Sequence, residues 1–106
     1  MEGVAVMPRV FISQDVGKIN FLPAEEFGEL VPVINGYVNH TQLKRSMARM
    51  QDQMRDITPE DWLVPAGHPA LIALAGHIMA DRTGYIRILA WDNQLSKYVP
   101  SEVRVR

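Results

Sequence analysis

The stretch DWLVPAGHPALIALAGHIMADRTGYIRILAW, residues 61–91, decides the fold. It begins with a short apolar run at 61–65 that is typical of a strand, and a tight turn containing glycine and proline follows at 66–69. The segment 69–81 predicts a helix that opens on proline, the residue favoured at the first helical position. The run at 85–91 predicts a second strand, because aromatic and β-branched residues are frequent in it. Strand, helix and strand in this order predict one parallel, right-handed βαβ unit.

The segments on either side of this unit supply the other elements. Short apolar runs at 10–12 and 29–34 predict two strands. The segment 41–56 predicts a second helix, which Thr41 would cap, because apolar residues recur along it at helical spacing. After the central unit, 97–99 predicts an antiparallel return strand at a sheet edge, which the tail could extend.

These elements and the length of 106 residues indicate one domain. Hydrophobic residues make up 47% of the chain and charged residues 22%, which is an ordinary globular composition. We therefore expect a single small α/β domain over residues 9–106, with a mixed sheet of four to five strands and two main helices in the order ββαβαββ. Residues 1–8 are expected to form a flexible N-terminal extension.

The composition also excludes several classes of function. The chain has no cysteine, so disulfides, thiolate catalysis and thiolate metal sites are excluded. The net charge of −1 argues against a general nucleic-acid or membrane-surface binder, and no apolar run is long enough to span a membrane. The three histidines, His40, His68 and His77, lack the spacing of a metal site. We expect a cytoplasmic protein with no cofactor and no metal.

A polar rim is the first candidate site. If the first and third strands are parallel, the loop at 13–18 and the turn at 67–69 lie at the same end of the sheet, where α/β proteins bind ligands. The residues that would contact a ligand there are Ser13, Gln14, Asp15, Lys18, Gly67 and His68. A plain connecting turn explains the same pattern and is favoured, because the turn has one glycine and its proline lacks an N–H donor. We assign no catalytic residue.

An interface between copies of the chain is the second candidate. A stripe of methionines runs along the helix at 41–56, and the helix at 69–81 is apolar on almost every side. We expect Leu71, Leu74 and Ile78 to be nearly fully buried, within the fold or between subunits. Self-association as a homodimer or larger assembly would cover these surfaces. The expected interface residues are Met47, Met50, Met54, Leu74, His77 and Ile78.

Single-stranded nucleic acid is a less favoured partner. The polar face of the helix at 41–56 carries an excess of basic residues, and two of them lie in its first turn, where cations oppose the helix dipole. Aromatic residues of the later strands could stack on bases. The residues of this alternative are Lys44, Arg45, Arg49, Arg55, Trp91 and Tyr98. A solvated helix face accounts for the same charges.

The second half of the chain resembles small accessory proteins of tailed bacteriophages. The resemblance rests on the Gly67-His68-Pro69-Ala70 turn, on Trp91-Asp92 and on Tyr98-Val99-Pro100, together with the segment AEEFGEL at 24–30. It covers most of residues 9–105. His68 stands where an aspartate is expected, which weakens any shared ligand chemistry. The resemblance implies a phage or prophage accessory protein and brings no particular activity with it.

The leading hypothesis is a non-enzymatic binding or regulatory module that acts through contacts with a host or phage protein. Two alternatives stay open. One is a single-stranded nucleic-acid-binding protein that uses the basic helix face at 44–55. The other is a small ligand-binding protein or enzyme whose site is the rim at 13–18 and 67–69.

Overall fold

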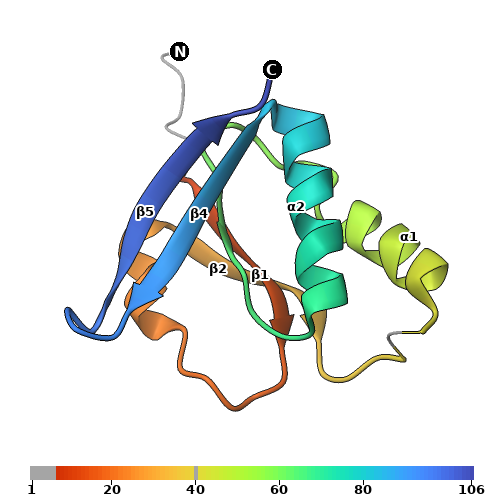
Figure 1. The fold of residues 1–106 in the computed structure, drawn as a ribbon, viewed down its shortest axis with the longest axis horizontal. Coiled ribbons are helices and arrows are strands. Elements are labelled where there is room, and N and C mark those ends of the chain that lie inside the picture. Colours follow the sequence, from red (N-terminus) through yellow and green to blue (C-terminus); the bar gives the residue numbers. More distant parts are fainter. Residues whose placement is uncertain (1–6, 40) are drawn as a thin grey trace.

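A five-stranded mixed sheet forms the centre of the computed structural model, which describes residues 7–39 and 41–106 (Figure 1). The strands are β1 (Arg9–Asp15), β2 (Glu29–Asn35), β3 (Trp62–Val64), β4 (Tyr85–Asp92) and β5 (Lys97–Arg104). The helices are the 3-10 helix η1 (Leu22–Phe27), α1 (Leu43–Gln53) and α2 (Pro69–Thr83). This confirms the predicted single α/β domain, its two main helices and its order of elements. The extension expected at 1–8 falls largely on residues 1–6, which lie outside the described residues.

The order of strands across the sheet is β2-β1-β3-β4-β5. The first four are parallel and β5 runs antiparallel to β4. The predicted βαβ unit is therefore β3-α2-β4, and a second helical crossover, β2-α1-β3, passes over β1. Because β2 and β3 lie on opposite sides of β1, the chain changes direction across the sheet at β1. Such a switch point is where open α/β sheets bind ligands, beyond the carboxyl ends of the strands.

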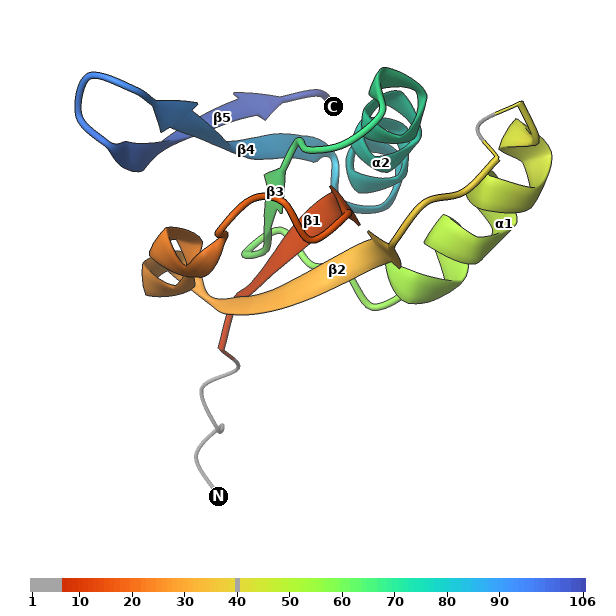
Figure 2. The same cartoon turned by 90° about the horizontal axis from the view of Figure 1, so that it is seen from below.

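The two crossover directions put the helices on opposite faces of the sheet. Right-handed crossovers that travel in opposite directions must lie on opposite faces. Accordingly η1, which connects β1 to β2, packs on one face, while α1 and α2 pack on the other (Figure 2). β1 is buried along most of its length because it has strands on both sides and helices on both faces.

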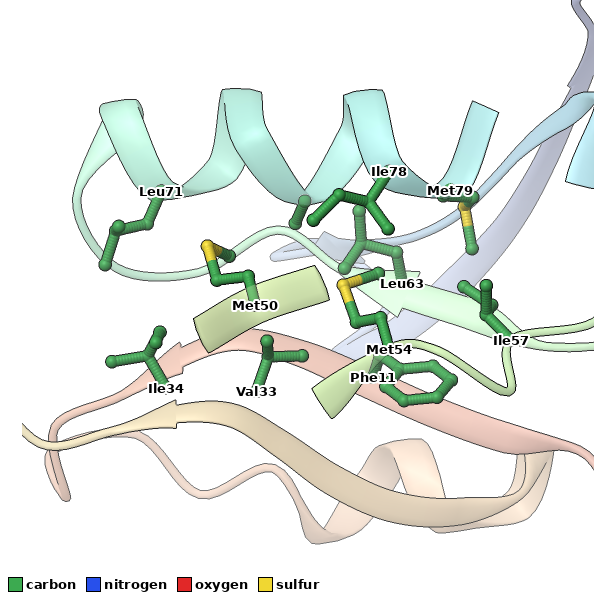
Figure 3. Close-up of a cluster of buried hydrophobic side chains, with 11 residues drawn as sticks. Phe11, Val33, Ile34, Met50, Met54, Ile57, Leu63, Leu71, Ile78 and Met79 are labelled. Carbon is green, nitrogen blue, oxygen red and sulfur yellow. The ribbon is translucent and has the colours of Figure 1, made fainter. Parts of the chain in front are cut away.

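The methionines of α1 belong to the larger core cluster. Met50 and Met54 are fully buried between α2 and the strands β1 and β2, close to Phe11 and Val33 (Figure 3). Ile78 of α2 is 2% exposed in the same cluster. The expected interface is wrong for these three residues, because a side chain that is buried in the single chain cannot contact a second copy.

The apolar helix α2 presents one face to the core rather than several. Its buried residues are Leu71, Ala75, Ile78 and Met79, whereas Ala73 and His77 are exposed and Leu74 is half-buried. The expectation of near-complete burial is thus confirmed for Leu71 and Ile78, and Leu74 falls short of it within the single chain. Alanines and a glycine occupy much of the outer face, so its apolar composition does not require a second buried side.

The predicted helix at 41–56 is shorter than expected at both ends, and Thr41 does not cap it. The Thr41 backbone N–H and hydroxyl both donate to Asn39 Oδ1, at 3.0 and 2.5 Å. The N-cap position is Gln42, whose side chain forms no capping hydrogen bond. In the described part of the chain, no helix has the length and apolarity to cross a membrane.

Candidate functional site: the carboxyl edge of the sheet

The predicted rim is assembled because β1 and β3 are parallel neighbours. The Ser13 hydroxyl, at the end of β1, donates to the Ala66 carbonyl at 2.5 Å and accepts from the Ala66 N–H at 2.8 Å. Gln14 Oε1 accepts from the His68 N–H at 2.8 Å, and its Nε2 donates to the Gly36 carbonyl at 3.0 Å. The rim residues of β1 therefore bind the backbone of the turn after β3.

Close packing explains the glycine of that turn. Gly67 has φ of +92°, which disfavours other residues, and a Cβ there would overlap with the Gln14 side chain. Ser13 is fully buried and Gln14 is 5% exposed. These side chains act as a structural joint between β1 and the turn, since their polar atoms are used within the protein.

The first turn of α2 does not present free donors to an anion. His68 is the N-cap of α2, and its Nδ1 accepts from the Ala70 N–H at 3.0 Å. The His68 carbonyl accepts from the N–H groups of Leu71 and Ile72, and Pro69 has no N–H. The first turn of α2 is thus satisfied by the protein itself, which favours the plain connecting turn over an anion site.

The remaining two rim candidates are used differently. Asp15 Oδ1 accepts from the Gly17 N–H at 2.8 Å within the loop after β1. Lys18 is exposed in the same loop. No acid–base arrangement of these groups follows from their positions.

A cleft of about 640 Å³ lies beside the turn, at the carboxyl ends of β3 and β4. Its walls come from the loop after β1, the turn after β3, the first turns of α2 and the ends of β4 and β5. The lining residues are Ile19, Asn20, Phe21, Val64, Pro65, Ala66, Gly67, Ile72, Leu89, Ala90, Trp91 and Tyr98. None of them carries a charge at neutral pH, so the cleft is suited to apolar groups.

Phe21, Trp91 and Tyr98 are the aromatic residues that line the cleft. Trp91 and Tyr98 face each other across β4 and β5 in a T-shaped pair with ring centroids 5.0 Å apart. The Trp91 indole N–H donates to Asn93 Oδ1 at 2.9 Å, and the side chain is 46% exposed. Tyr98 is buried, and burial raises the pKa of its phenol above the ordinary value of 10.0. Tyr98 therefore stays neutral at physiological pH.

The two parts of the predicted nucleic-acid surface lie apart. Three of the basic residues are on α1 and Arg55 follows it, and α1 packs beside β2 at one edge of the sheet. Trp91 and Tyr98 are on β4 and β5 at the other edge (Figure 1). Arg55 is paired with Asp52 at 3.3 Å and with Asp56 at 4.0 Å. Tyr98 is only 5% exposed, so little of its ring is accessible for stacking on a base.

Several cleft residues are absent from the sequence-based predictions. Ile19 and Phe21 belong to a loop with no periodic pattern, and Ile72 is one apolar residue among many in α2. Leu89 lies two residues before Trp91 and therefore on the same face of β4, and this alternation was the available signal for Leu89. Among the described residues, no group of three or more histidine or acidic side chains is placed to hold a metal ion.

Comparison with known proteins supplies the family. The sequence model of phage Pam3 gp32-like proteins matches residues 8–105. No curated protein and no solved structure matches the chain. The match agrees with the resemblance to small phage proteins noted above and extends over nearly the whole domain. We conclude that the chain belongs to the family of phage Pam3 gp32-like proteins.

Proposed function

We propose that this phage protein is a non-enzymatic binding module and that its cleft at the carboxyl ends of β3 and β4 takes an apolar segment of a partner protein. The observation that carries the proposal is the uncharged, aromatic lining of a cleft of about 640 Å³. A volume in this range accommodates a few apolar side chains. Burial of such side chains is a main source of free energy in protein association.

A protein partner is favoured over a small ligand because apolar surface continues beyond the cleft. Ile19 is 56% exposed and Trp91 is 46% exposed at its walls, and Leu95 in the turn after β4 is 58% exposed. Exposed apolar patches of this kind mark interaction sites in soluble proteins. A small molecule inside the cleft would leave most of this surface in water.

Chemistry on a bound substrate has little support at the cleft. Tyr98 is its only lining residue with a titratable side chain, and its raised pKa makes it a poor acid or base near neutral pH. The polar atoms of Ser13 and Gln14 are already used in the joint beside it. These features favour binding over catalysis.

Site-specific photocrosslinking from the cleft tests the proposal. A photoreactive phenylalanine analogue would replace Trp91, and a second variant would carry it at Gln51, which is exposed on α1. In lysate of phage-infected cells treated with nuclease, we expect a protein crosslinked through position 91 and not through position 51. Mass spectrometry of the crosslinked peptide should identify an uncharged, apolar segment.

Binding of the purified partner then gives the decisive comparison. Ile19→Asp should weaken that binding by about tenfold or more, because the charge would be desolvated at the interface. Val103→Asp is the matched control, since Val103 is 60% exposed and pairs with Ile86, at the opposite end of the β4–β5 hairpin from Trp91. Equal effects of the two variants, a polar crosslinked segment, or capture of a small molecule or oligonucleotide in place of a protein would each refute the proposal.

A further inference from the structure

A second and smaller pocket, separate from the apolar cleft, lies where the loop after β2 meets the start of α1. Its volume is about 250 Å³, below the usual range of pockets for drug-sized ligands. The lining residues are Val38, Asn39, Gln42, Arg45, Ser46 and Arg49. All of them except Val38 carry side-chain hydrogen-bond donors. The pocket is therefore suited to a small group that is rich in acceptor atoms.

Two arginines dominate the charge of this pocket. Arg45 and Arg49 are four residues apart on one face of α1, a spacing at which like charges repel each other. Neither forms a salt bridge with any described residue, and the first turn of α1 has no acidic side chain. Arg45 also lies near the positive end of the helix dipole. A bound anion would relieve all of these unfavourable contributions.

Ser46 contributes a hydroxyl to the lining of the pocket. Its side chain is 5% exposed, and its N–H donates to the Gln42 carbonyl as part of α1. Among residues 7–39 and 41–106 no buried side-chain nitrogen or oxygen lacks a hydrogen-bond partner, so the Ser46 hydroxyl, which takes part in none of the hydrogen bonds there, faces the open space of the pocket. The hydroxyl is thus available to a group that enters the pocket.

We propose that this pocket binds a phosphate group, either free or as an ester. Arg45 and Arg49 would form charge-assisted hydrogen bonds to it, and Ser46 Oγ and the amides of Asn39 and Gln42 would complete the set of donors. A phosphate carries a charge of about −1.5 to −2 and three acceptor oxygens, which the two guanidinium groups and the neutral donors match better than they match a carboxylate. This site is independent of the partner proposed for the apolar cleft.

Titration of the full chain with inorganic phosphate, followed by two-dimensional amide NMR, tests this site. Sodium chloride at the same ionic strength provides the reference titration. We expect saturable shifts at Gln42, Arg45, Ser46 and Arg49 with phosphate and none with chloride. Glycerol phosphate should shift the same residues if the ligand is an ester, and it should fail to do so if only the free ion fits.

Matched variants distinguish phosphate binding in this pocket from a general effect of net charge. Arg49→Gln should weaken phosphate binding by about tenfold or more, the expected loss for a hydrogen bond between charged groups. Arg55→Gln is the control, because it removes the same charge just after α1, where Arg55 is already paired with Asp52. Ser46→Ala should also weaken binding while leaving the rest of the spectrum unchanged.

Three outcomes would overturn the proposal. The first is the absence of saturable shifts with either phosphate compound. The second is an equal loss of binding in Arg49→Gln and Arg55→Gln, which would indicate net charge alone. The third is tighter binding of a single-stranded oligonucleotide with shifts that spread along α1 to Lys44 and Arg55, which would favour a nucleic-acid surface instead.

Discussion

At the scale of single residues, buried polar groups join segments that are distant in the sequence. Asp61 is 2% exposed and lies just before β3. Its Oδ1 accepts from the Arg9 N–H at 2.8 Å, and its Oδ2 accepts from the Thr58 N–H at 2.8 Å. One carboxylate thus ties the start of β1 to the loop that follows α1. Ser13 and Gln14 join the other end of β1 to the turn after β3.

Asp61→Asn should destabilise the fold by about 2 kcal/mol, because an amide NH₂ would face an N–H donor where a charged acceptor now stands. Asp52→Asn is the control, since the Asp52 side chain is 72% exposed on α1. Urea denaturation measures both free energies of unfolding. Equal midpoints for the two variants would show that the Asp61 bonds contribute nothing to stability.

Tyr98 should make stability depend on pH in alkaline solution. Burial raises the pKa of its phenol in the folded state above 10.0, so the unfolded chain loses this proton first. The contribution of Tyr98 is therefore fully present below about pH 10 and is lost as pH rises through the folded-state pKa. Tyr98→Phe should flatten the fall of unfolding free energy above pH 10, whereas Tyr37→Phe, at a 73% exposed position, should leave it unchanged.

At the scale of elements, short strands are reinforced by side chains. β3 has three residues, and its register with β4 rests on the pair Leu63↔Ile88. Arg87 of β4 supplements this contact, because its guanidinium stacks 3.8 Å above the centre of the Trp62 ring and its Nε donates to the Asp61 carbonyl at 3.2 Å. It also pairs with Glu102 of β5 at 2.5 Å. The β4–β5 hairpin is thereby joined to the parallel part of the sheet.

Two leucines of α2 should contribute different amounts to the free energy of unfolding, because they are buried to different extents. Leu71→Ala should cost about 2–5 kcal/mol, the usual range for a core leucine, because Leu71 is fully buried against the sheet. Leu74→Ala should cost less, because Leu74 is half-buried at the edge of the same cluster. Thermal and urea denaturation of both variants measure the difference. The reverse order would contradict this placement of α2.

At the scale of the whole molecule, the parallel strands bring both candidate sites to one side of the sheet, beyond the carboxyl ends of the strands. The loops after β1, β2 and β3 and the turn after β4 all leave the sheet at its carboxyl edge, where both the apolar cleft and the arginine pocket lie. β5 is an edge strand of the sheet, and its Pro100 and alternating charges are typical of an edge strand that is protected from pairing with another chain. We therefore expect partners to bind at the carboxyl edge.

Self-association is a separate prediction for the whole molecule. Of the expected interface residues, Met47 and Leu74 are half-buried and His77 is exposed, so these three remain available to a second copy. We expect a dimer at tens of micromolar protein in sedimentation equilibrium. His77→Asp should lower the measured mass, and Gln94→Asp, in the exposed turn after β4, should not. A single species of 12.0 kDa for the unmodified chain would contradict the prediction.

The sequence by itself determined the class of the fold and the order of its elements. Hydrophobic spacing and turn residues act over short distances, so the strand–helix–strand unit at 61–91 and the edge strand with Pro100 could be recognised without a structure. The sequence predicted that the loop at 13–18 and the turn at 67–69 lie together only if the first and third strands are parallel. The start of the helix at 41–56 was not determined in this way, because the Thr41 hydroxyl donates to Asn39 Oδ1 instead of accepting from a helical N–H.

Only the tertiary structure decided which side chains meet. The position of β1 between β2 and β3 turns Ser13 and Gln14 into a structural joint, and it leaves the cleft to Ile19, Trp91 and other apolar residues from separate loops. Packing likewise placed Met50 in the core and left Arg45, Arg49 and Ser46 around a pocket. The physical reason is that local spacing determines secondary structure, whereas contacts across a sheet depend on strand order, which long-range packing selects.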